Sequence, residues 1–373
     1  MSLIAARMQG IDASGIRKVF DLGAQLKDPI NLSIGQPDFD VSDELKDIAV
    51  TAIRAGYNKY TPTQGLPELN AAIMEYLARG SGFKPEASLV CSGVSGALFL
   101  LMLAVLDPGD EIIFPDPYFV MYKHLAHLVG ARAVMVDTYP DFQLDPGKIE
   151  AALTPKTKMI LINSPSNPTG VIYSREVLTA VADMARRRNI LVVSDEIYRE
   201  FCYDEPYCSI AEVYPENTVV LNGLSKTSGM PGWRIGFAAG PKQIIEEMTK
   251  LQQYTFVCAP SFAQKAAVRA FALGNTHHAE YLARRNLIYN GLREAGYKVM
   301  RPGGAFYIFP KCPIEEDRFV EMALAKNCLI VPGSVFSERR GYFRISFAVH
   351  EDILRRGIEV FADLARETGG QHG

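Results

Sequence analysis

A lysine and an arginine lie eight residues apart in a loop rich in glycine and serine, and both side chains can do chemistry. Lys226 and Arg234 belong to the stretch LSKTSGMPGWRIG, which follows the apolar run 218–221 and precedes another strand-like run. A primary amine can condense with an aldehyde cofactor, and a guanidinium can bind a phosphate through two parallel hydrogen bonds. The pair therefore favours a pyridoxal phosphate site. An ordinary loop with two surface cations is the alternative, because both residue types are mostly exposed.

The hydrophobic pattern predicts the scaffold that must position these cations. From residue 88 onward, short apolar runs alternate with helical patterns, and the run 190–193 is apolar throughout. Such runs are typical of parallel strands that are buried on both faces of a sheet. We expect an α/β fold: a large domain with a mostly parallel, doubly wound sheet, plus a smaller α+β domain. The strands expected in the large domain are 111–114, 133–136, 159–162, 190–194, 218–221 and 235–239.

The C-terminal pattern differs from this alternation. Two helices are expected at 261–273 and 278–295, followed by strand-like runs at 298–300, 306–309, 328–331 and 343–347 around a helix near 317–325; a last amphipathic helix covers 351–367. We therefore predict an N-terminal arm with part of the small domain at 1–40, a large domain at 41–275 and a small domain at 276–373. Residues 1–30 are weakly periodic and suit a mobile arm or a partner-binding segment.

Several polar residues follow the predicted strands, where ligands bind in open α/β sheets. Asp195 follows the run 190–194 and can pair with a pyridinium nitrogen, with Tyr198 near the ring's 3-hydroxyl group. Read alone, Asp195 is equally a helix cap or a loop acid. Asn167 lies in NSPSNPTG, at 163–170, which has the composition of a turn but contains two X-Pro bonds that can be cis.

A helix start and an aromatic residue add weaker signals. The segment SGVSGA, at 92–97, opens a helix, and the unpaired N–H groups of a helix N-terminus suit a phosphate dianion. Phe119 can stack on a pyridine ring or can be one more core aromatic.

Composition excludes several classes of function. The chain has 373 residues and a net charge of −3, so it has no basic field for nucleic acid. Its longest apolar run, 97–106, is half the length that a membrane span needs, and the N-terminus lacks the apolar core of a signal peptide. We therefore expect a cytoplasmic protein. The six cysteines and six histidines show no zinc-site spacing, and we expect no metal site.

Six motifs, in this order along nearly the whole chain, resemble the class I/II aminotransferases, which are fold-type I pyridoxal-phosphate enzymes. They are GQPDF at 35–39, YTPTQG at 60–65, NPTG at 167–170, DEIY at 195–198, SK at 225–226 with GWR at 232–234, and FRIS at 343–346. The resemblance implies transfer of an amino group from an α-amino acid to a 2-oxo acid such as 2-oxoglutarate, by a ping-pong mechanism. Aspartate, alanine and aromatic amino acids are the candidate donors.

The resemblance also implies roles for individual residues. Lys226 carries the cofactor as a Schiff base and transfers the proton, with Asp195 at the ring nitrogen and Tyr198 at the 3-oxygen as further catalytic residues. Gly35, Asn167 and Arg344 bind the substrate. The cofactor-binding set is Val94, Ser95, Phe119, Asn167, Asp195, Tyr198, Ser225, Lys226, Arg234 and, from the neighbouring subunit, Tyr60. The resemblance thus implies a homodimer with shared active sites.

Two positions depart from the family pattern. Many relatives have a phosphate-binding serine three residues before the lysine, where this chain has Gly223; Ser225 is the candidate replacement. Relatives selective for dicarboxylic substrates often place a cation near the 94–95 turn or elsewhere, whereas position 95 here is serine. Two other functions stay open at this point: a C–S lyase or decarboxylase that uses the same cofactor, and a cofactor-binding regulator without catalysis.

Overall fold

A computed structural model describes residues 3–369, so residues 1–2 and 370–373, at the outer ends of two predicted domains, lie outside the described residues. The α-helices are α1 Gly15–Gly23, α2 Asp43–Arg54, α3 Pro67–Ser81, α4 Gly93–Val105, α5 Met121–Leu128, α6 Pro146–Ala152, α7 Arg175–Arg188, α8 Lys242–Gln253, α9 Ser261–Leu273, α10 His278–Glu294, α11 Glu316–Ala325 and α12 Glu351–Glu367. The strands are β1 Ile30–Asn31, β2 Ala87–Ser92, β3 Glu111–Asp116, β4 Arg132–Asp137, β5 Thr157–Asn163, β6 Leu191–Asp195, β7 Thr218–Gly223, β8 Ile235–Gly240, β9 Tyr307–Ile308, β10 Cys328–Leu329, β11 Val331–Pro332 and β12 Phe343–Ser346. Five short 3₁₀ helices complete the set: η1 Ala6–Gly10, η2 Ile210–Glu212, η3 Pro215–Asn217, η4 Pro231–Trp233 and η5 Gly333–Val335.

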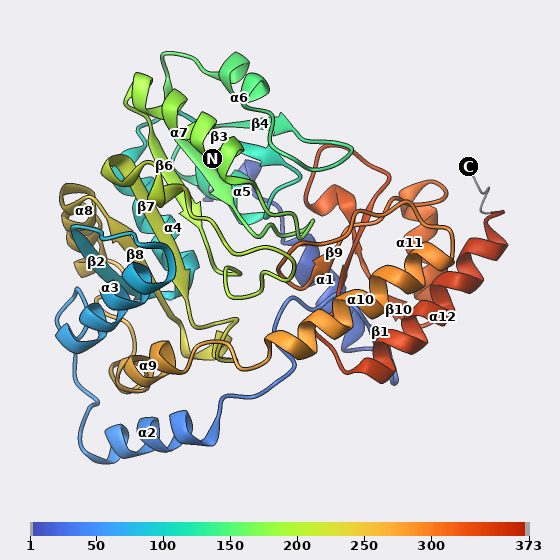
Figure 1. Cartoon of the computed structure of the whole chain (residues 1–373), viewed down its shortest axis with the longest axis horizontal. Coiled ribbons are helices and arrows are strands. Elements are labelled where there is room, and N and C mark those ends of the chain that lie inside the picture. The colour runs from blue at the N-terminus through green and yellow to red at the C-terminus, as the bar shows by residue number, and fades with distance from the viewer. Residues whose placement is uncertain (1–2, 370–373) are drawn as a thin grey trace.

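A seven-stranded sheet forms the centre of the larger part of the molecule (Figure 1), in the order β2-β8-β7-β6-β5-β3-β4. Only β8 runs against its neighbours, because it is antiparallel to both β2 and β7. Alternate residues of β5 pack on opposite faces: Met159 and Leu161 join the cluster of α4, α5 and α8, whereas Ile160 and Ile162 join that of α6 and α7. This confirms the predicted α/β fold, because helices cover both faces of a mostly parallel sheet.

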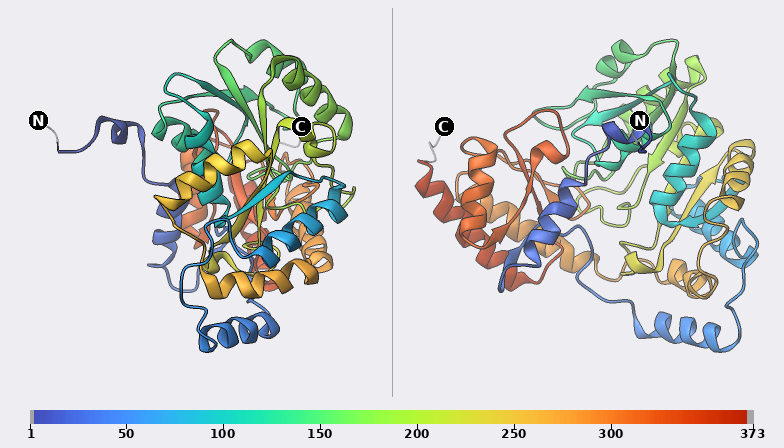
Figure 2. Two further views of the ribbon diagram at one scale, coloured as in Figure 1. Left: turned by 90° about the vertical axis from the view of Figure 1, so that its left-hand side faces the viewer. Right: turned by 180° about the vertical axis from the view of Figure 1, so that it is seen from behind.

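The smaller part is built from two small sheets and helices α10, α11 and α12, at the right of Figure 1. Strand β1 pairs with β10 in parallel, and β12 lies between β11 and β9 in an antiparallel sheet. The N-terminal segment therefore completes a layer made of C-terminal residues. In the left view of Figure 2 the N-terminal segment projects outward from the body, and η1 contacts α5: His127 Nε2 lies 2.9 Å from Arg7 O.

The structure corrects several details of the expected elements. Residues 298–300 form no strand; Lys298 makes one ladder-like contact, from Lys311 N to Lys298 O at 3.0 Å. The run 328–331 is divided between β10 and β11, which belong to different sheets. Helices α1 and α8 and strands β1 and β2 were not expected. Strand β1 is two residues long and is held by pairing with a distant segment, so its local pattern carries little signal.

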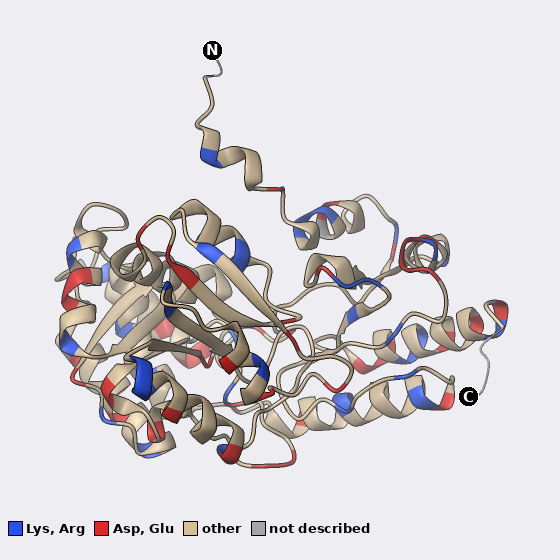
Figure 3. Cartoon of the chain, turned by 90° about the horizontal axis from the view of Figure 1, so that it is seen from above, with Lys and Arg blue, Asp and Glu red and all other residues tan. Residues whose placement is uncertain are grey.

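Charged residues of both signs are interspersed over the helices (Figure 3), in line with the net charge of −3. Within residues 3–369, no helix is both long enough and apolar enough to cross a membrane. The same residues contain no group of three or more His, Cys, Asp or Glu side chains placed to hold a metal ion.

Candidate active site

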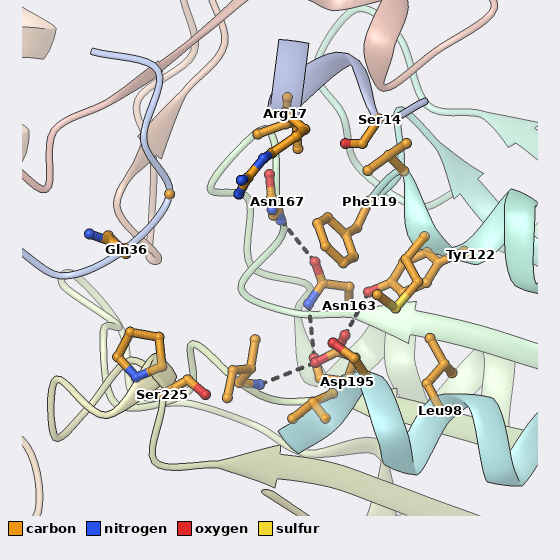
Figure 4. Close-up of a pocket in the computed structure, with 18 of the residues that line it drawn as sticks. Ser14, Arg17, Gln36, Leu98, Phe119, Tyr122, Asn163, Asn167, Asp195 and Ser225 are labelled. Carbon is orange, nitrogen blue, oxygen red and sulfur yellow. Dashed lines mark hydrogen bonds between the residues drawn. The ribbon is translucent and has the colours of Figure 1, made fainter. Parts of the chain in front are cut away.

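The register of two neighbouring strands brings two polar side chains together at the carboxyl ends of those strands. Asn163 and Asp195 are the last residues of β5 and β6, and they are direct partners in the ladder. Asn163 Nδ2 donates to the Asp195 carbonyl oxygen at 3.0 Å, and Asn167 N donates to Asn163 Oδ1 at 2.8 Å (Figure 4). The peptide bonds Ser164-Pro165 and Asn167-Pro168 are both cis. Strand pairing thus places Asn163 beside Asp195, and Asn163 in turn holds the backbone of Asn167.

Asp195 is a buried carboxyl group, with 4% of its surface exposed. Tyr122 donates its hydroxyl hydrogen to Asp195 Oδ2 at 2.7 Å, and Ile197 N donates to Oδ1 at 3.3 Å. Burial raises the pKa of Asp195 to about 6, against the lowering effect of the Tyr122 hydrogen bond. The group is therefore ionised at neutral pH in a poorly solvated place, which suits a protonated ring nitrogen.

Lys226 is a half-buried amine whose Nζ donates to the Gly35 carbonyl oxygen at 2.7 Å. Burial, followed by the positive charge of Arg344, lowers the pKa of Lys226 to about 8, and the Asp195 carboxylate opposes this shift. A lysine with an ordinary pKa near 10.5 is almost fully protonated at pH 8. The environment of Lys226 thus makes a neutral, nucleophilic amine available near neutral pH.

Arg234 lies against the first turn of α4. Its Nη2 donates to Ser92 O at 3.2 Å, and its Nη1 donates to Pro231 O at 3.0 Å. Gly93 has a φ of 68°, and a Cβ atom there would lie 2.6 Å from Arg234 Nη2. The missing side chain leaves the guanidinium beside the N–H groups of Val94 and Ser95, which have no intrahelical acceptor in the first turn. This cradle suits a phosphate dianion.

The close pairing of β7 and β8 explains why position 223 departs from the family pattern. A Cβ atom at this position would lie 2.6 Å from Ile235 O and 2.8 Å from Gly236 Cα, because β7 and β8 pair closely there. A serine cannot be accommodated without moving the backbone of β8. Ser225, two residues later, lines the cavity.

Arg344 is fully enclosed, with 1% of its surface exposed. Its Nη1 donates to Asn167 Oδ1 at 3.0 Å and its Nη2 donates to Ser33 O at 2.8 Å. The guanidinium carbon lies 4.5 Å from the ring centre of Tyr307 and 4.7 Å from that of Phe336. Its buried Nε has no hydrogen-bond partner among the described residues. A buried guanidinium held in this way suits a ligand carboxylate.

Tyr307, which the sequence did not indicate, links Gly35 to Tyr198 through hydrogen bonds. Tyr307 donates its hydroxyl hydrogen to Gly35 O at 3.3 Å, and its oxygen lies 2.9 Å from the Tyr198 hydroxyl oxygen. Gly35 O thus accepts from Tyr307 and Lys226, whereas the carbonyl that supports Arg344 belongs to Ser33. A Cβ atom at Gly35 would lie 2.4 Å from the Tyr307 oxygen, which explains the glycine.

These side chains surround one cavity of about 670 Å³. Nearly all of the predicted site residues line it: Gly35, Val94, Ser95, Phe119, Asn167, Asp195, Tyr198, Ser225, Lys226, Arg234 and Arg344. Tyr60 does not, since it lies on the surface with 83% of its area exposed. The volume is in the range for a cofactor with a small substrate.

Three residues with polar contacts in the site were missed. Asn163 directly follows the predicted strand 159–162, so the strand-end rule that selected Asp195 could have found it. Tyr122 lies one helical turn after Phe119, and Tyr307 lies inside an apolar strand. Neither tyrosine has a local signal, because each acts through a contact between distant elements. The N-terminal residues Ile11–Arg17 were also not expected at the cavity, which five of them line.

Comparison with known proteins identifies the class. A profile of the family "Aminotransferase class I and II" matches residues 27–361, so the chain belongs to this family. It is 40% identical to a probable N-acetyl-LL-diaminopimelate aminotransferase of Bacillus subtilis, over 96% of this chain and 94% of the other. It is 38% identical to the aspartate/prephenate aminotransferase of Thermus thermophilus, over 92% and 93% of the two chains.

A solved structure agrees with these relatives. The aspartate aminotransferase of Thermus thermophilus with maleate superposes with a TM-score of 0.93 at 37% identity, covering 98% of this chain and 100% of that one. The chain is therefore an aminotransferase of fold type I, and its cofactor is pyridoxal 5′-phosphate. The Lys226 amine, the Asp195 carboxylate and the phosphate cradle of Arg234 fit this cofactor on the geometry described above.

Proposed function

We propose that Lys226 is the catalytic amine of this aminotransferase, because its Nζ lies in the cavity with a pKa lowered to about 8. When bound, pyridoxal phosphate supplies the electron sink that lets the substrate's Cα–H bond break. Lys226 Nζ holds the cofactor's aldehyde carbon between turnovers. During turnover it accepts a proton from the substrate Cα and returns it to that aldehyde carbon.

The other residues bind and orient. Arg234, Ser225 and the N–H groups of Val94 and Ser95 hold the phosphate, and Phe119 covers one face of the ring. Asp195, oriented by Tyr122, keeps the ring nitrogen protonated. Tyr198 and the Asn167 amide group donate to the 3-oxygen; Asn167 Oδ1 already accepts from Arg344, so its Nδ2 is the donor that remains. These assignments rest on the shared cavity and on the hydrogen bonds that orient Asp195, Asn167, Tyr198 and Arg234.

Arg344 binds the substrate α-carboxylate in this proposal. Its guanidinium is buried between Tyr307 and Phe336, and the two neighbouring oxygens of Asn167 and Ser33 hold its orientation. A planar fork matches a carboxylate better than a lysine ammonium does. The observation that supports the whole assignment best is that this fork and the Lys226 amine line the same cavity.

A half-reaction experiment tests the function. An amino acid added alone to the purified enzyme with its cofactor should change the visible absorption once and release one equivalent of 2-oxo acid. Addition of 2-oxoglutarate should then restore the first spectrum and yield glutamate. Continuous release of ammonia and pyruvate, or of carbon dioxide, without an acceptor would instead indicate a lyase or a decarboxylase. Aspartate, alanine and aromatic amino acids are the donors to compare, and the names of two relatives include aspartate or prephenate.

We further propose a homodimer in which Tyr60 serves the partner's site. Tyr60 and Tyr254 are 83% and 87% exposed, and Phe256 is exposed although it lies next to α4. Large exposed aromatics are typical of surfaces that a partner covers. A complementation experiment tests this: Lys226→Ala and Tyr60→Phe chains, each weak alone, should form mixed dimers with one intact site. No recovery of activity on mixing would place Tyr60 in its own chain's site or outside any site.

The predicted domain ranges are also a proposal: 1–40 with the small domain, 41–275 and 276–373. Pairing of β1 with β10, and the hydrogen bond from Ser346 N to Leu32 O at 2.7 Å, support placing the N-terminal strand with the small domain. Packing of α9 against α2 and α3 supports a boundary after α9. A cytoplasmic location stays a prediction from composition.

A further inference from the structure

Tyr307 has no role in the proposed function, although it lies among the residues that carry it out. It lines the cavity with 1% of its surface exposed, and its ring centre lies 4.5 Å from the guanidinium carbon of Arg344. Its hydroxyl oxygen lies 2.9 Å from that of Tyr198 and 3.3 Å from Gly35 O. Gly35 O also accepts a hydrogen bond from Lys226 Nζ at 2.7 Å. Tyr307 therefore lies between the oxygen that holds the amine and the tyrosine assigned to the 3-oxygen.

Packing fixes the hydroxyl oxygen of Tyr307. The residue belongs to β9 and is the ladder partner of Ser346 in β12. A Cβ atom at Gly35 would lie 2.4 Å from this oxygen, so the backbone at position 35 is already in contact with the phenol. The ring also packs edge to face on that of Tyr198, with the ring centres 5.5 Å apart. The oxygen can therefore keep its place while the hydroxyl hydrogen rotates about the C–O bond.

The hydroxyl hydrogen of Tyr307 has two acceptors within reach. A tyrosine hydroxyl group donates one hydrogen and can also accept. Burial raises the pKa of both Tyr307 and Tyr198, so both groups keep their hydrogens at neutral pH. The 2.9 Å contact with Tyr198 lies in the usual range for O–H···O bonds, whereas the 3.3 Å contact with Gly35 O lies beyond it. While Lys226 occupies Gly35 O, the contact of Tyr307 with this carbonyl is thus the weaker one.

The balance changes when Lys226 reacts. The neutral Lys226 amine has two hydrogens, and both leave with the aldehyde oxygen as water when its nitrogen forms a C=N bond with the cofactor's aldehyde carbon. Gly35 O then loses its nearest donor, and among residues 3–369 Tyr307 is the other donor in contact with it. A carbonyl oxygen that is shielded from water and lacks a donor costs free energy. Tyr198 depends less on Tyr307, because its own hydrogen still bonds the 3-oxygen.

We propose that Tyr307 is a positioning residue that donates to Gly35 O when Lys226 binds the cofactor and turns back to Tyr198 when Lys226 is released. The hydrogen changes its acceptor, and no heavy atom of Tyr307 has to move. Gly35 O thereby keeps a donor in both states, which favours capture of the cofactor by the amine. The inference rests on the proposed function, because it requires Lys226 as the amine.

The first test compares two ligands that differ at the aldehyde carbon. Pyridoxal phosphate can bond covalently to Lys226, whereas pyridoxine 5′-phosphate carries an alcohol there and leaves Nζ on Gly35 O. Their affinities for the full-length protein freed of its cofactor would be measured by calorimetry. Tyr307→Phe should lower the ratio of the affinity for pyridoxal phosphate to that for pyridoxine phosphate about three- to tenfold, the effect of one neutral hydrogen bond. A general loss of packing would weaken both ligands alike and leave the ratio unchanged.

Tyr297→Phe is the matched control. Tyr297 is also a buried tyrosine whose hydroxyl group donates to a backbone oxygen, Phe361 O at 3.0 Å, but it does not line the cavity. This variant should keep the affinity ratio of the parent protein. An unchanged ratio in Tyr307→Phe, or an equal fall in Tyr297→Phe, would overturn the role of Tyr307.

Borohydride reduction separates this inference from the proposed function. The reagent reduces a C=N bond and so fixes the cofactor on the lysine that holds it. In the parent protein the modified residue, identified by mass spectrometry of peptides, should be Lys226. A parent protein without this product would contradict the proposed function. A parent protein with it, together with an unchanged affinity ratio in Tyr307→Phe, would contradict only the role of Tyr307.

Discussion

At its closed end the cavity is bounded by Asp195, Asn167 and Arg344, which are nearly fully buried and held by hydrogen bonds within and between neighbouring elements, including one from Tyr122 of α5 to Asp195. At its mouth it is bounded by residues 11–17, where Asp12 and Arg17 are exposed. Buried polar groups must be satisfied, so their positions are determined by the fold. Exposed groups can change partners at small cost. The closed end therefore suits the chemistry common to every substrate, and the mouth suits the choice among substrates.

The largest effect is expected at the closed end, for Lys226→Ala. Loss of the amine should lower turnover by about 10³-fold or more, because both nucleophile and proton carrier are removed. It should also change the visible absorption of the bound cofactor. Lys242→Ala, on the exposed face of α8, is the matched control and should be unaffected. Substantial turnover in purified Lys226→Ala enzyme would remove Lys226 from its role.

The pH dependence of cofactor capture should follow the same amine. The pKa of Lys226 is lowered to about 8, so its neutral fraction stays high down to about pH 8. The neutral fraction of a lysine with the usual pKa near 10.5 already falls below about pH 10.5. The rate at which the apo protein captures pyridoxal phosphate should rise about tenfold per pH unit up to pH 8 and then level off. The rate would be followed by absorbance, relative to a free lysine derivative in the same buffers. A rise that continues through pH 10 would contradict the lowered pKa.

A smaller effect on all donors alike is expected for Arg344→Lys. The variant keeps the charge but loses the fork, which should cost about 1–3 kcal/mol, or roughly 5- to 150-fold in kcat/KM. This loss should be similar for aspartate, alanine and phenylalanine, since all share the α-carboxylate. Steady-state kinetics with the three donors would measure it, with Arg355→Lys on the exposed face of α12 as control. A loss confined to aspartate would mean that Arg344 binds the donor's side chain and not its α-carboxylate.

The smallest effect is expected for Tyr122→Phe, which should weaken cofactor binding roughly severalfold. The Tyr122 hydroxyl group lowers the pKa of Asp195, whose burial raises it to about 6. Asp195 loses its charge as the pH falls through its pKa, so cofactor affinity should weaken below about pH 6 in the parent. In Tyr122→Phe the midpoint should move to higher pH. Titration of cofactor binding between pH 5 and 8 would measure this, with Tyr118→Phe as control; identical midpoints would contradict the role of Tyr122.

Several of the predicted site residues that line the cavity have a local signal in the sequence. Asp195 follows one apolar run and Asn167 lies in the loop after another, so strand-end position favoured them. Lys226 was indicated by its amine and its spacing from Arg234, and the resemblance supplied the roles. Tyr122 and Tyr307 have no such signal, since one lies on a helix face and the other inside a strand. Gly35 was predicted to bind the substrate with Asn167 and Arg344, and in the structure its carbonyl oxygen accepts hydrogen bonds from Lys226 and Tyr307.

By itself, the sequence determined the α/β class, the parallel strands and the set of groups that can bind a phosphate, a ring nitrogen and a carboxylate. These follow from apolar runs and from the residue types beyond them, which are local properties of the chain. Only the tertiary structure decided that β7 and β8 exclude a serine at position 223, that Tyr122 orients Asp195, and that α1 brings Arg17 to the mouth of the cavity. Each of these depends on close contact between segments far apart in the sequence, and such contacts are decided by packing.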